Sequence, residues 1–359
     1  MTLFKSLAIL AGLCFIATMY MVVSGNTIHA GPPLIGFFLM LAISFRGYHA
    51  LKGFTYTVMI LAAVTTALFY PQYFVEWEGF RFTLLITPLI QLIMFGMGTS
   101  MSFGDFLGVV KMPKGVFIGV VSHFIIMPML GFALASVSTL EPEIAAGVIL
   151  IGCSPNGMAS NVISYLAGAN LALSITITAI STMLSPFITP LLMKLLAGAL
   201  VEIDVLNMMW DITKMVILPI GAGLLFNRLF SGKAKWLDHA MPLVSMIGVA
   251  FSIVVITAAG RNSLISIGPI LLLLVLIHNM SGYFLGYWSA RLFKMEERDC
   301  RTIAIEVGMQ NGGLASGIAK EMGKIATIGL APAIFGPLMN VTGSLLASWW
   351  HKSTPLDRS

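Results

Sequence analysis

Apolar runs long enough to cross a lipid bilayer occupy most of this 359-residue chain and constrain its fold more than any other feature. A membrane-spanning helix needs about 20 apolar residues, and within the hydrocarbon every backbone N–H and C=O must be paired inside the protein. Of the residues, 58% are hydrophobic and only 10% are charged, whereas soluble domains carry roughly a quarter charged residues. The sequence therefore predicts an all-α polytopic membrane protein with no room for a soluble catalytic or nucleic-acid-binding domain.

The apolar runs form an N-terminal pair and a longer later series. The pair comprises residues 5–23 and a shorter run at 34–45, which we expect to cross the membrane or to re-enter it without changing the parity of the later spans. The later series lies at 54–70, 82–99, 115–138, 143–167, 170–200, 206–229, 239–260, 264–292, 301–319 and 327–350.

The basic residues predict the orientation of these runs, because Lys and Arg are enriched on the cytoplasmic side of membrane proteins. If the N-terminus is cytoplasmic and every run crosses once, most of the Lys and Arg residues lie at the cytoplasmic ends of the runs, among them Arg46, Lys111, Lys114 and Lys294. Both termini are then expected inside, with residues 353–359 as a cytoplasmic tail. The net charge of +5 follows from this topology and does not indicate a nucleic-acid partner.

The later runs divide into two groups of five, which we predict as domains at residues 48–200 and 201–352, after extra N-terminal membrane segments at 1–47. An odd number of spans in the first group places the second group in the opposite orientation. Such inverted repeats recur in secondary transporters. We therefore predict a ten-helix core of two inverted five-helix repeats, with one or two extra N-terminal helices.

The fourth run of each group is interrupted by polar residues and glycine. The first interruption, GCSPNGMASN, lies at residues 152–161, and the second, EVGMQNGG, lies at 306–313. Backbone groups freed by Pro155 and the glycines cannot face lipid unpaired. Helix N-termini suit anions and helix C-terminal carbonyls suit cations. Two such unwound helices that cross therefore predict a site for a cation beside an anion.

Polar side chains near these interruptions agree with a cation site. Glu306 stands well inside an apolar run, and a carboxylate at that depth marks an ion or proton pathway. Ser174 and Thr178 are spaced i, i+4 and share one face of the following helix. Together with Ser160 and Asn161 they offer several neutral oxygens and a single carboxylate. This set suits a small monovalent cation better than Ca²⁺ or Mg²⁺, which usually bind more carboxylates.

The two interruptions resemble the crossover motifs of the bile acid:sodium symporter family, which end in Gly-Gly/Ser-Asn in the first half and read E-x-G-x-Q-N in the second. The resemblance extends over residues 54–350, with further matching stretches at 93–98, 241–245, 276–288 and 340–350. It implies a sodium-coupled symporter that carries an organic anion by alternating access in the inner membrane of a bacterium. Two sodium ions are expected behind the crossovers, with the cargo in front of them.

The resemblance also implies which residues bind. The first sodium site is similar to Ser160, Asn161, Ser174, Thr178 and Glu306. The second uses Glu306 again, the backbone carbonyls of Val307 and Met309, the side chain of Gln310, and His123 where many relatives have Gln. The organic anion would face Asn156, Met158, Asn311 and Asn340. Asn156 and Met158 depart from the family pattern, so the cargo could be bile-acid-like, pantoate-like or another carboxylate or sulfonate.

Other function classes are weaker. A proton-linked or sodium/proton exchanger with the same architecture is the alternative, and it requires a second titrating group beside Glu306, for which His123 is available. An enzyme is not supported, because no GxSxG, HExxH or paired membrane aspartates are present. The widely spaced Cys14, Cys153 and Cys300 predict neither a disulfide nor a metal site. The expected partners are sodium, an organic anion and the bilayer, and the oligomeric state stays open.

Overall fold

The chain is helical almost throughout in a computed structural model, which describes residues 2–48, 51–102, 104, 108–230 and 235–352. Within these residues the strands are limited to one short antiparallel pair, β1 (Glu76–Trp77) and β2 (Phe80–Arg81). In the described part of the chain, eight helices are long and apolar enough to cross a membrane. The predicted all-α polytopic class is confirmed, and the expected tail at 353–359 lies outside the described residues.

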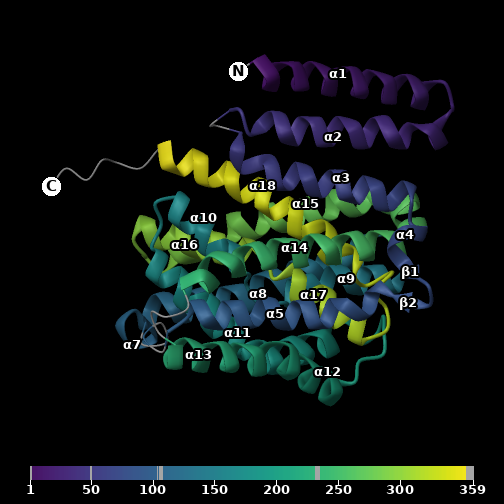
Figure 1. The fold of residues 1–359 in the computed structure, drawn as a ribbon. Coiled ribbons are helices and arrows are strands. Elements are labelled where there is room, and N and C mark those ends of the chain that lie inside the picture. Colours follow the sequence, from purple (N-terminus) through teal and green to yellow (C-terminus); the bar gives the residue numbers. More distant parts are fainter. Residues whose placement is uncertain (1, 49–50, 103, 105–107, 231–234, 353–359) are drawn as a thin grey trace. The chain divides into compact units, whose positions relative to one another are not determined.

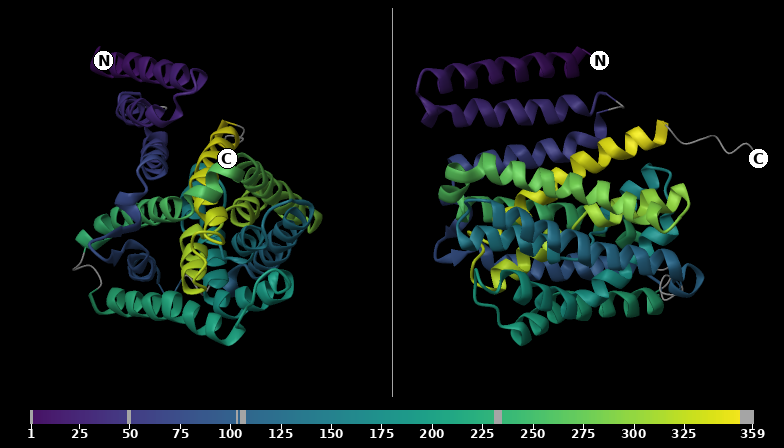
Figure 2. Two further views of the ribbon diagram at one scale, coloured as in Figure 1. Left: turned by 90° about the vertical axis from the view of Figure 1, so that its right-hand side faces the viewer. Right: turned by 180° about the vertical axis from the view of Figure 1, so that it is seen from behind.

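The chain divides into two compact units, of which the first comprises Met1–Thr83 and Ile253–Asn262. In this unit α1 packs on α2 and α2 packs on α3, as the purple and dark blue helices of Figures 1 and 2 show. The hydroxyl of Ser44 donates to the carbonyl of Phe4 at 2.9 Å. The elements are α1 (Thr2–Val23), η1 (Thr27–Ala30), α2 (Gly31–Phe45), η2 (Lys52–Phe54), α3 (Thr55–Phe69) and α4 (Gln72–Val75).

The second N-terminal helix is longer than the apolar run 34–45 predicts. It begins at Gly31, and the 3₁₀ turn η1 precedes it without a gap. Pro32 and Pro33 occupy its first turn, where a missing N–H leaves no helical hydrogen bond unmade. The combined stretch Thr27–Phe45 is long enough to span a bilayer.

The second unit comprises Leu84–Ser252 and Ser263–Ser359 and contains both interrupted helices. The turn η3 (Phe82–Leu85) spans the boundary along the chain, and the last residues of α14 and the first two of α15 are assigned to the first unit. Its helices are α5 (Ile86–Ser100), α7 (Gly108–Lys111), α8 (Pro113–Val137), α9 (Pro142–Cys153), α10 (Ala159–Leu166), α11 (Leu171–Ala197), α12 (Val205–Ile212), the π-helical turn η4 (Thr213–Ile217), α13 (Leu218–Phe230), α14 (Lys235–Ala259), α15 (Arg261–Leu292), α16 (Glu297–Gly308), α17 (Gly312–Glu321) and α18 (Leu330–Lys352).

The two interruptions fall where the sequence places them, between α9 and α10 and between α16 and α17. Helix α9 ends at Cys153 because Pro155 has no N–H and keeps Ser154 extended, with ψ at 152°. Helix α16 ends at Gly308, and Asn311 caps the start of α17 by accepting from the N–H of Leu314. Each interruption therefore lies between two helices that follow one another along the chain.

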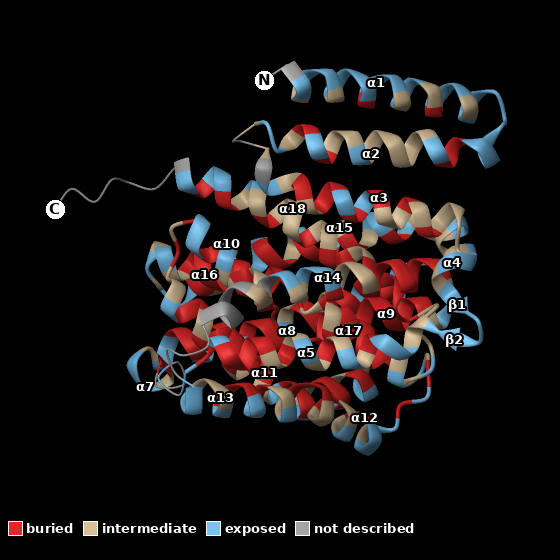
Figure 3. Cartoon of the chain, viewed as in Figure 1, coloured by how far each residue is buried: buried red, intermediate tan, exposed pale blue. Residues whose placement is uncertain are grey.

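Helix α9 and helix α16 are buried along almost their whole length, as Figure 3 shows in red. Glycines let their neighbours approach at backbone distance. A Cβ at Gly152 would stand 2.4 Å from the carbonyl oxygen of Met127 in α8, and a Cβ at Gly282 in α15 would stand 3.0 Å from the Cα of Gly308. The broken helices are thus held on both sides by continuous ones.

We expect Gly152→Ala to lower the melting temperature of the purified protein, because the added methyl group collides with the Met127 backbone, which cannot move aside. The expected loss is about 1–3 kcal/mol of unfolding free energy. Gly221→Ala in α13 is the matched control, since no atom lies within 4 Å of a Cβ there. Equal melting temperatures for the two variants would contradict the close packing.

Candidate functional site

The two interruptions meet in the middle of the second unit. The N–H of Asn311 donates to the carbonyl of Pro155 at 2.7 Å, and Asn156 forms an antiparallel bridge with Gln310. Backbone groups that leave a helix must be paired when they are buried. Here each break pairs with the other, in the antiparallel direction.

Glu306 lies fully buried beside this crossing, two residues before α16 ends. Its carboxylate accepts from Ser174 Oγ at 2.5 Å and from Thr178 Oγ1 at 2.9 Å, both on α11. No described Lys, Arg or His forms an ion pair with it within 4 Å. A buried carboxylate without a cationic partner is strongly unfavourable, so Glu306 requires either a bound cation or a proton.

The hydrogen-bond acceptor contacts around Glu306 outnumber the hydroxyl protons that are available to them. Ser174 has one hydroxyl proton, yet its oxygen is 2.8 Å from Asn161 Oδ1 as well as 2.5 Å from Glu306. Thr178 likewise faces Asn161 Oδ1 at 3.3 Å and Glu306 at 2.9 Å. The proton of Ser160 is used by the Gly157 carbonyl at 2.8 Å. Two protons thus serve four acceptor contacts, an arrangement that a bound cation would complete.

All residues predicted for the first sodium site are brought together in this cluster. Ser160 and Asn161 come from the start of α10, Ser174 and Thr178 from one face of α11, and Glu306 from α16. The hydroxyls of Ser160 and Thr178 are 3.3 Å apart. The i, i+4 spacing read from the sequence is what lets α11 present both hydroxyls to one carboxylate.

The residues predicted for the second site also lie around the crossing. The ring of His123 contacts two backbone carbonyls, that of Glu306 at 3.1 Å and that of Ser154 at 2.9 Å. Gln310 donates to the Val307 carbonyl at 2.9 Å, while its own buried Oε1 has no hydrogen-bond partner. Met309 follows the last residue of α16. The free oxygen of Gln310 is therefore available to a cation or to a hydrogen-bond donor.

The residues predicted to face the cargo have different surroundings. Asn156 is fully buried, donates to the Glu306 carbonyl at 2.6 Å and accepts from Ser181. Met158, Asn311 and Asn340 are half-buried. Asn311 uses its side-chain oxygen as the cap of α17.

Sequence reasoning missed two polar groups that hold the crossing. Ser181 continues the hydroxyl row of α11 one turn beyond Thr178, and that periodicity could have revealed it. Asn279 of α15 donates to the Gly308 carbonyl at 2.8 Å and accepts from Thr342 of α18 at 2.6 Å. Its position inside an apolar run was the available signal. Ser181 thus hydrogen-bonds the side-chain amide of Asn156 in the first interruption, and Asn279 hydrogen-bonds the backbone at the second.

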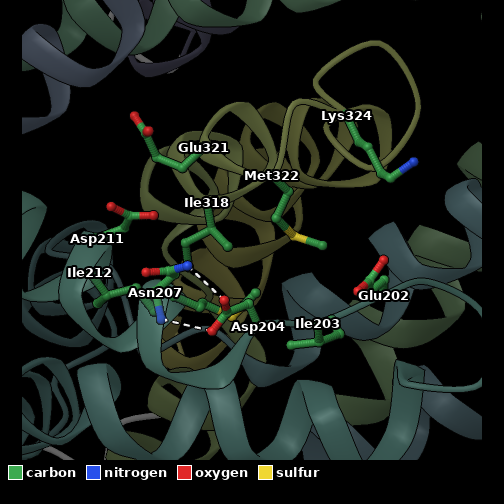
Figure 4. A pocket seen from close by; sticks show the side chains of 11 residues that line it. Glu202, Ile203, Asp204, Asn207, Asp211, Ile212, Ile318, Glu321, Met322 and Lys324 are labelled. Carbon is green, nitrogen blue, oxygen red and sulfur yellow. Dashed lines mark hydrogen bonds between the residues drawn. The ribbon is translucent and has the colours of Figure 1, made fainter.

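A separate cavity of about 350 Å³ opens between α12 and α17 and contains none of the predicted ligands. Figure 4 shows its acidic lining and the hydrogen bonds from Asn207 to Asp204. Two further carboxylates there form ion pairs, Asp211 with Lys214 and Glu321 with Lys320, each at 2.8 Å. Among the described residues, no group of three His, Cys, Asp or Glu could hold a metal ion.

A helical membrane protein whose two interrupted helices cross beside a buried carboxylate has the architecture of a secondary transporter. The sequence profile of the Sodium Bile acid symporter family matches residues 87–267. The chain belongs to this family, as its crossover motifs predict. The family indicates a membrane transporter.

Similar proteins carry names that agree with this assignment. The chain is 38% identical over 301 residues to the uncharacterized sodium-dependent transporter YocS of Bacillus subtilis (strain 168), covering 84% of this chain and 92% of that protein. It is 32% identical over 309 residues to the probable sodium/metabolite cotransporter BASS1 of Oryza sativa subsp. japonica, covering 84% and 74%. It is 33% identical over 304 residues to the probable cotransporter BASS6 of Arabidopsis thaliana, covering 82% and 73%.

We expect Asn156 and Ser181 to be energetically coupled, because Ser181 donates to the same side-chain amide of Asn156 that donates to the Glu306 carbonyl. Ser181→Ala leaves the buried Oδ1 of Asn156 without a donor, which costs about 1–3 kcal/mol, and Asn156→Ala removes one of the two contacts of the Glu306 carbonyl. The double variant should lose clearly less stability than the sum of the two single variants. Denaturant unfolding of all four proteins measures this, and strictly additive losses would show that the contact carries no stability.

Proposed function

We propose that this protein is a sodium-coupled secondary active symporter of an organic anion that works by alternating access. In this proposal the protein lies in the inner membrane of a bacterium, with both termini in the cytoplasm. Residues 48–200 and 201–352 act as inverted repeats and follow the extra membrane segments at 1–47. The observation that carries the proposal is the excess of oxygen atoms over protons around the buried Glu306 carboxylate.

The first sodium ion is bound by Ser160, Asn161, Ser174, Thr178 and Glu306. A single negative charge with neutral oxygens matches a monovalent cation, because Ca²⁺ and Mg²⁺ usually require more carboxylates or retained water. When the ion enters, the hydroxyl protons of Ser174 and Thr178 turn away and their lone pairs face the cation. The ion also supplies the positive charge that the buried carboxylate lacks.

The second sodium ion is bound by Gln310, the carbonyls of Val307 and Met309, Glu306 and His123. The unpaired Oε1 of Gln310 supports this assignment, because a buried amide oxygen without a donor is costly unless a cation faces it. Carbonyls at the C-terminal end of α16 add their negative dipole end.

The organic anion is recognised in front of the crossing by Met158, Asn311 and Asn340, with Asn156 linking it to the cation side. The half-buried positions of the first three leave them room to contact a ligand. Helices α10 and α17 both begin at the crossing, and their N-terminal N–H groups favour a carboxylate or sulfonate. The relatives' names, sodium-dependent transporter and sodium/metabolite cotransporter, support sodium as the coupling ion and a small molecule as cargo.

A proton-linked exchanger is the second candidate, and the geometry of His123 favours it. Both ring nitrogens face carbonyl oxygens, but a neutral imidazole can donate only one hydrogen bond. In proteoliposomes, a symporter accumulates anion when a sodium gradient is imposed at equal pH. An exchanger instead moves sodium when a pH gradient is imposed without any anion.

We expect Glu306→Gln to abolish sodium-dependent stabilisation, because it removes the charge shared by both sodium sites. Sodium at 100 times its Kd should stabilise the wild-type protein by about 2.7 kcal/mol relative to potassium. The measurement is the melting temperature in detergent in NaCl and in KCl, with the exposed Glu202→Gln as control. A Glu306→Gln protein that keeps the full sodium preference would refute the proposed sites.

Alternating access also requires a closed gate, and we assign it to α5 and α17. Thr87 of α5 donates to Glu321 of α17 at 2.6 Å. A Cβ at Gly317 would stand 2.5 Å from Ile90 Cδ1 and 3.1 Å from Met215 Sδ, so α17 is seated directly against α5 and η4. In the proposed orientation these contacts lie on the outer side, and they must part before cargo reaches the crossing from there.

We expect Gly317→Val to wedge this gate open, because its methyl groups occupy the space of the Ile90 side chain. A membrane-impermeant maleimide should then label an added Ser316→Cys, whose position in α17 is buried, severalfold faster than in the Gly317 background. Adding Ile90→Ala should restore slow labelling by making room. Labelling that is equally slow with Gly317→Val, or that Ile90→Ala does not slow again, would contradict the gate.

A further inference from the structure

One side of α8 is an apolar ridge that the described part of the second unit leaves partly exposed. Phe117, Val121 and Ile125 follow one another at i, i+4 and i+8, with exposed fractions of 70%, 37% and 57%. The opposite side of the helix carries the buried His123 and Met127. The ridge is therefore a separate surface from the site at the crossing.

A hollow lies on each side of this ridge, and Phe117 and Val121 line both of them. The larger hollow, of about 850 Å³, lies between α8 and a row on α11 formed by Ile180, Leu184 and Ile188. The smaller, of about 210 Å³, is closed by Phe293, which follows α15. Two apolar hollows separated by a ridge can each hold part of a hydrocarbon chain.

The polar end of the surface is basic. Lys114 lines the smaller hollow, Lys111 lies one turn earlier, and Lys294 directly follows Phe293. All three are exposed, and none forms an ion pair with an acidic residue that the structure describes. Because α8 begins at Pro113 and α15 ends at Leu292, these lysines lie at the ends of membrane-spanning segments, where lipid headgroups are found.

Two of the three acidic side chains that follow Lys294 are already engaged, and the third, Glu296, is exposed and forms no ion pair with a described lysine. Glu297 accepts from Arg301 at 3.0 Å and from Tyr287 at 2.7 Å, and Asp299 accepts from Asn170 at 2.9 Å. The positive charge of the three lysines is thus available to an outside anion. Basic pockets between membrane helices bind anionic lipid headgroups.

We propose that this surface binds one anionic diacyl phospholipid. Its two chains lie on either side of the Phe117–Val121 ridge, and its phosphate lies against Lys114, with Lys111 and Lys294 beside it. One ridge with two hollows accounts for two chains, and one basic cluster accounts for one headgroup. The inference is independent of the proposed transport function, since it uses the opposite side of α8.

Native mass spectrometry of the full-length protein in detergent tests the proposal. After titration with dioleoyl phosphatidylglycerol, one lipid should remain bound, and dioleoyl phosphatidylcholine should bind more weakly. Lys114→Ala should weaken phosphatidylglycerol binding about fivefold, as expected for one lysine. Lys5→Ala, an exposed lysine of α1, is the matched control and should change nothing.

A second variant tests the hollows without the charge. Val121→Trp fills both of them and should reduce retention of either lipid, whereas Leu272→Trp on the exposed side of α15 should not. Equal binding of the two lipids by the wild-type protein, or equal effects of Lys114→Ala and Lys5→Ala, would overturn the proposal. A protein dimer that Val121→Trp abolishes would assign the ridge to a second copy of the chain and would also overturn it.

Discussion

A carboxylate buried where two interrupted helices meet is the constraint on which the rest of the second unit depends. Glu306 has no cationic partner within the described residues, and the hydroxyls of Ser174 and Thr178 supply hydrogen bonds without supplying charge. The unwound backbone beside it is paired across the crossing, from Asn311 to Pro155. Helix α11 must therefore lie against α16 for its hydroxyls to reach Glu306. Both breaks must lie at the same depth for their unwound backbones to pair.

Much of this could be predicted from the sequence because lipid allows few solutions. A long apolar run must be a helix, so the positions of the helices followed from the runs. Pro155 and the glycines near Gln310 placed the two breaks, since they cannot continue a regular helix. The hydroxyls of α11 came from their helical spacing. These inferences use only the residue types and their spacing within one segment, and a single sequence provides both.

Contacts between distant segments could not be predicted in this way. The apolar run was expected to begin at Arg301, but α16 begins at Glu297. The guanidinium of Arg301 is accommodated in the protein because it bonds Glu297 at 3.0 Å and the Trp350 carbonyl at 3.1 Å. Likewise, the bonds of Asn156 to Ser181 and to the Glu306 carbonyl depend on how three helices pack. No pattern within one segment contains that information.

The most direct test of the central claim is to determine the structure of the purified protein in NaCl and again in KCl. We predict density for a bound ion between the Glu306 carboxylate, Asn161 Oδ1 and the hydroxyls of Ser160, Ser174 and Thr178 in sodium, and its absence in potassium. An empty cluster in sodium, or equal density in both salts, would contradict a sodium site at the crossing of the two broken helices.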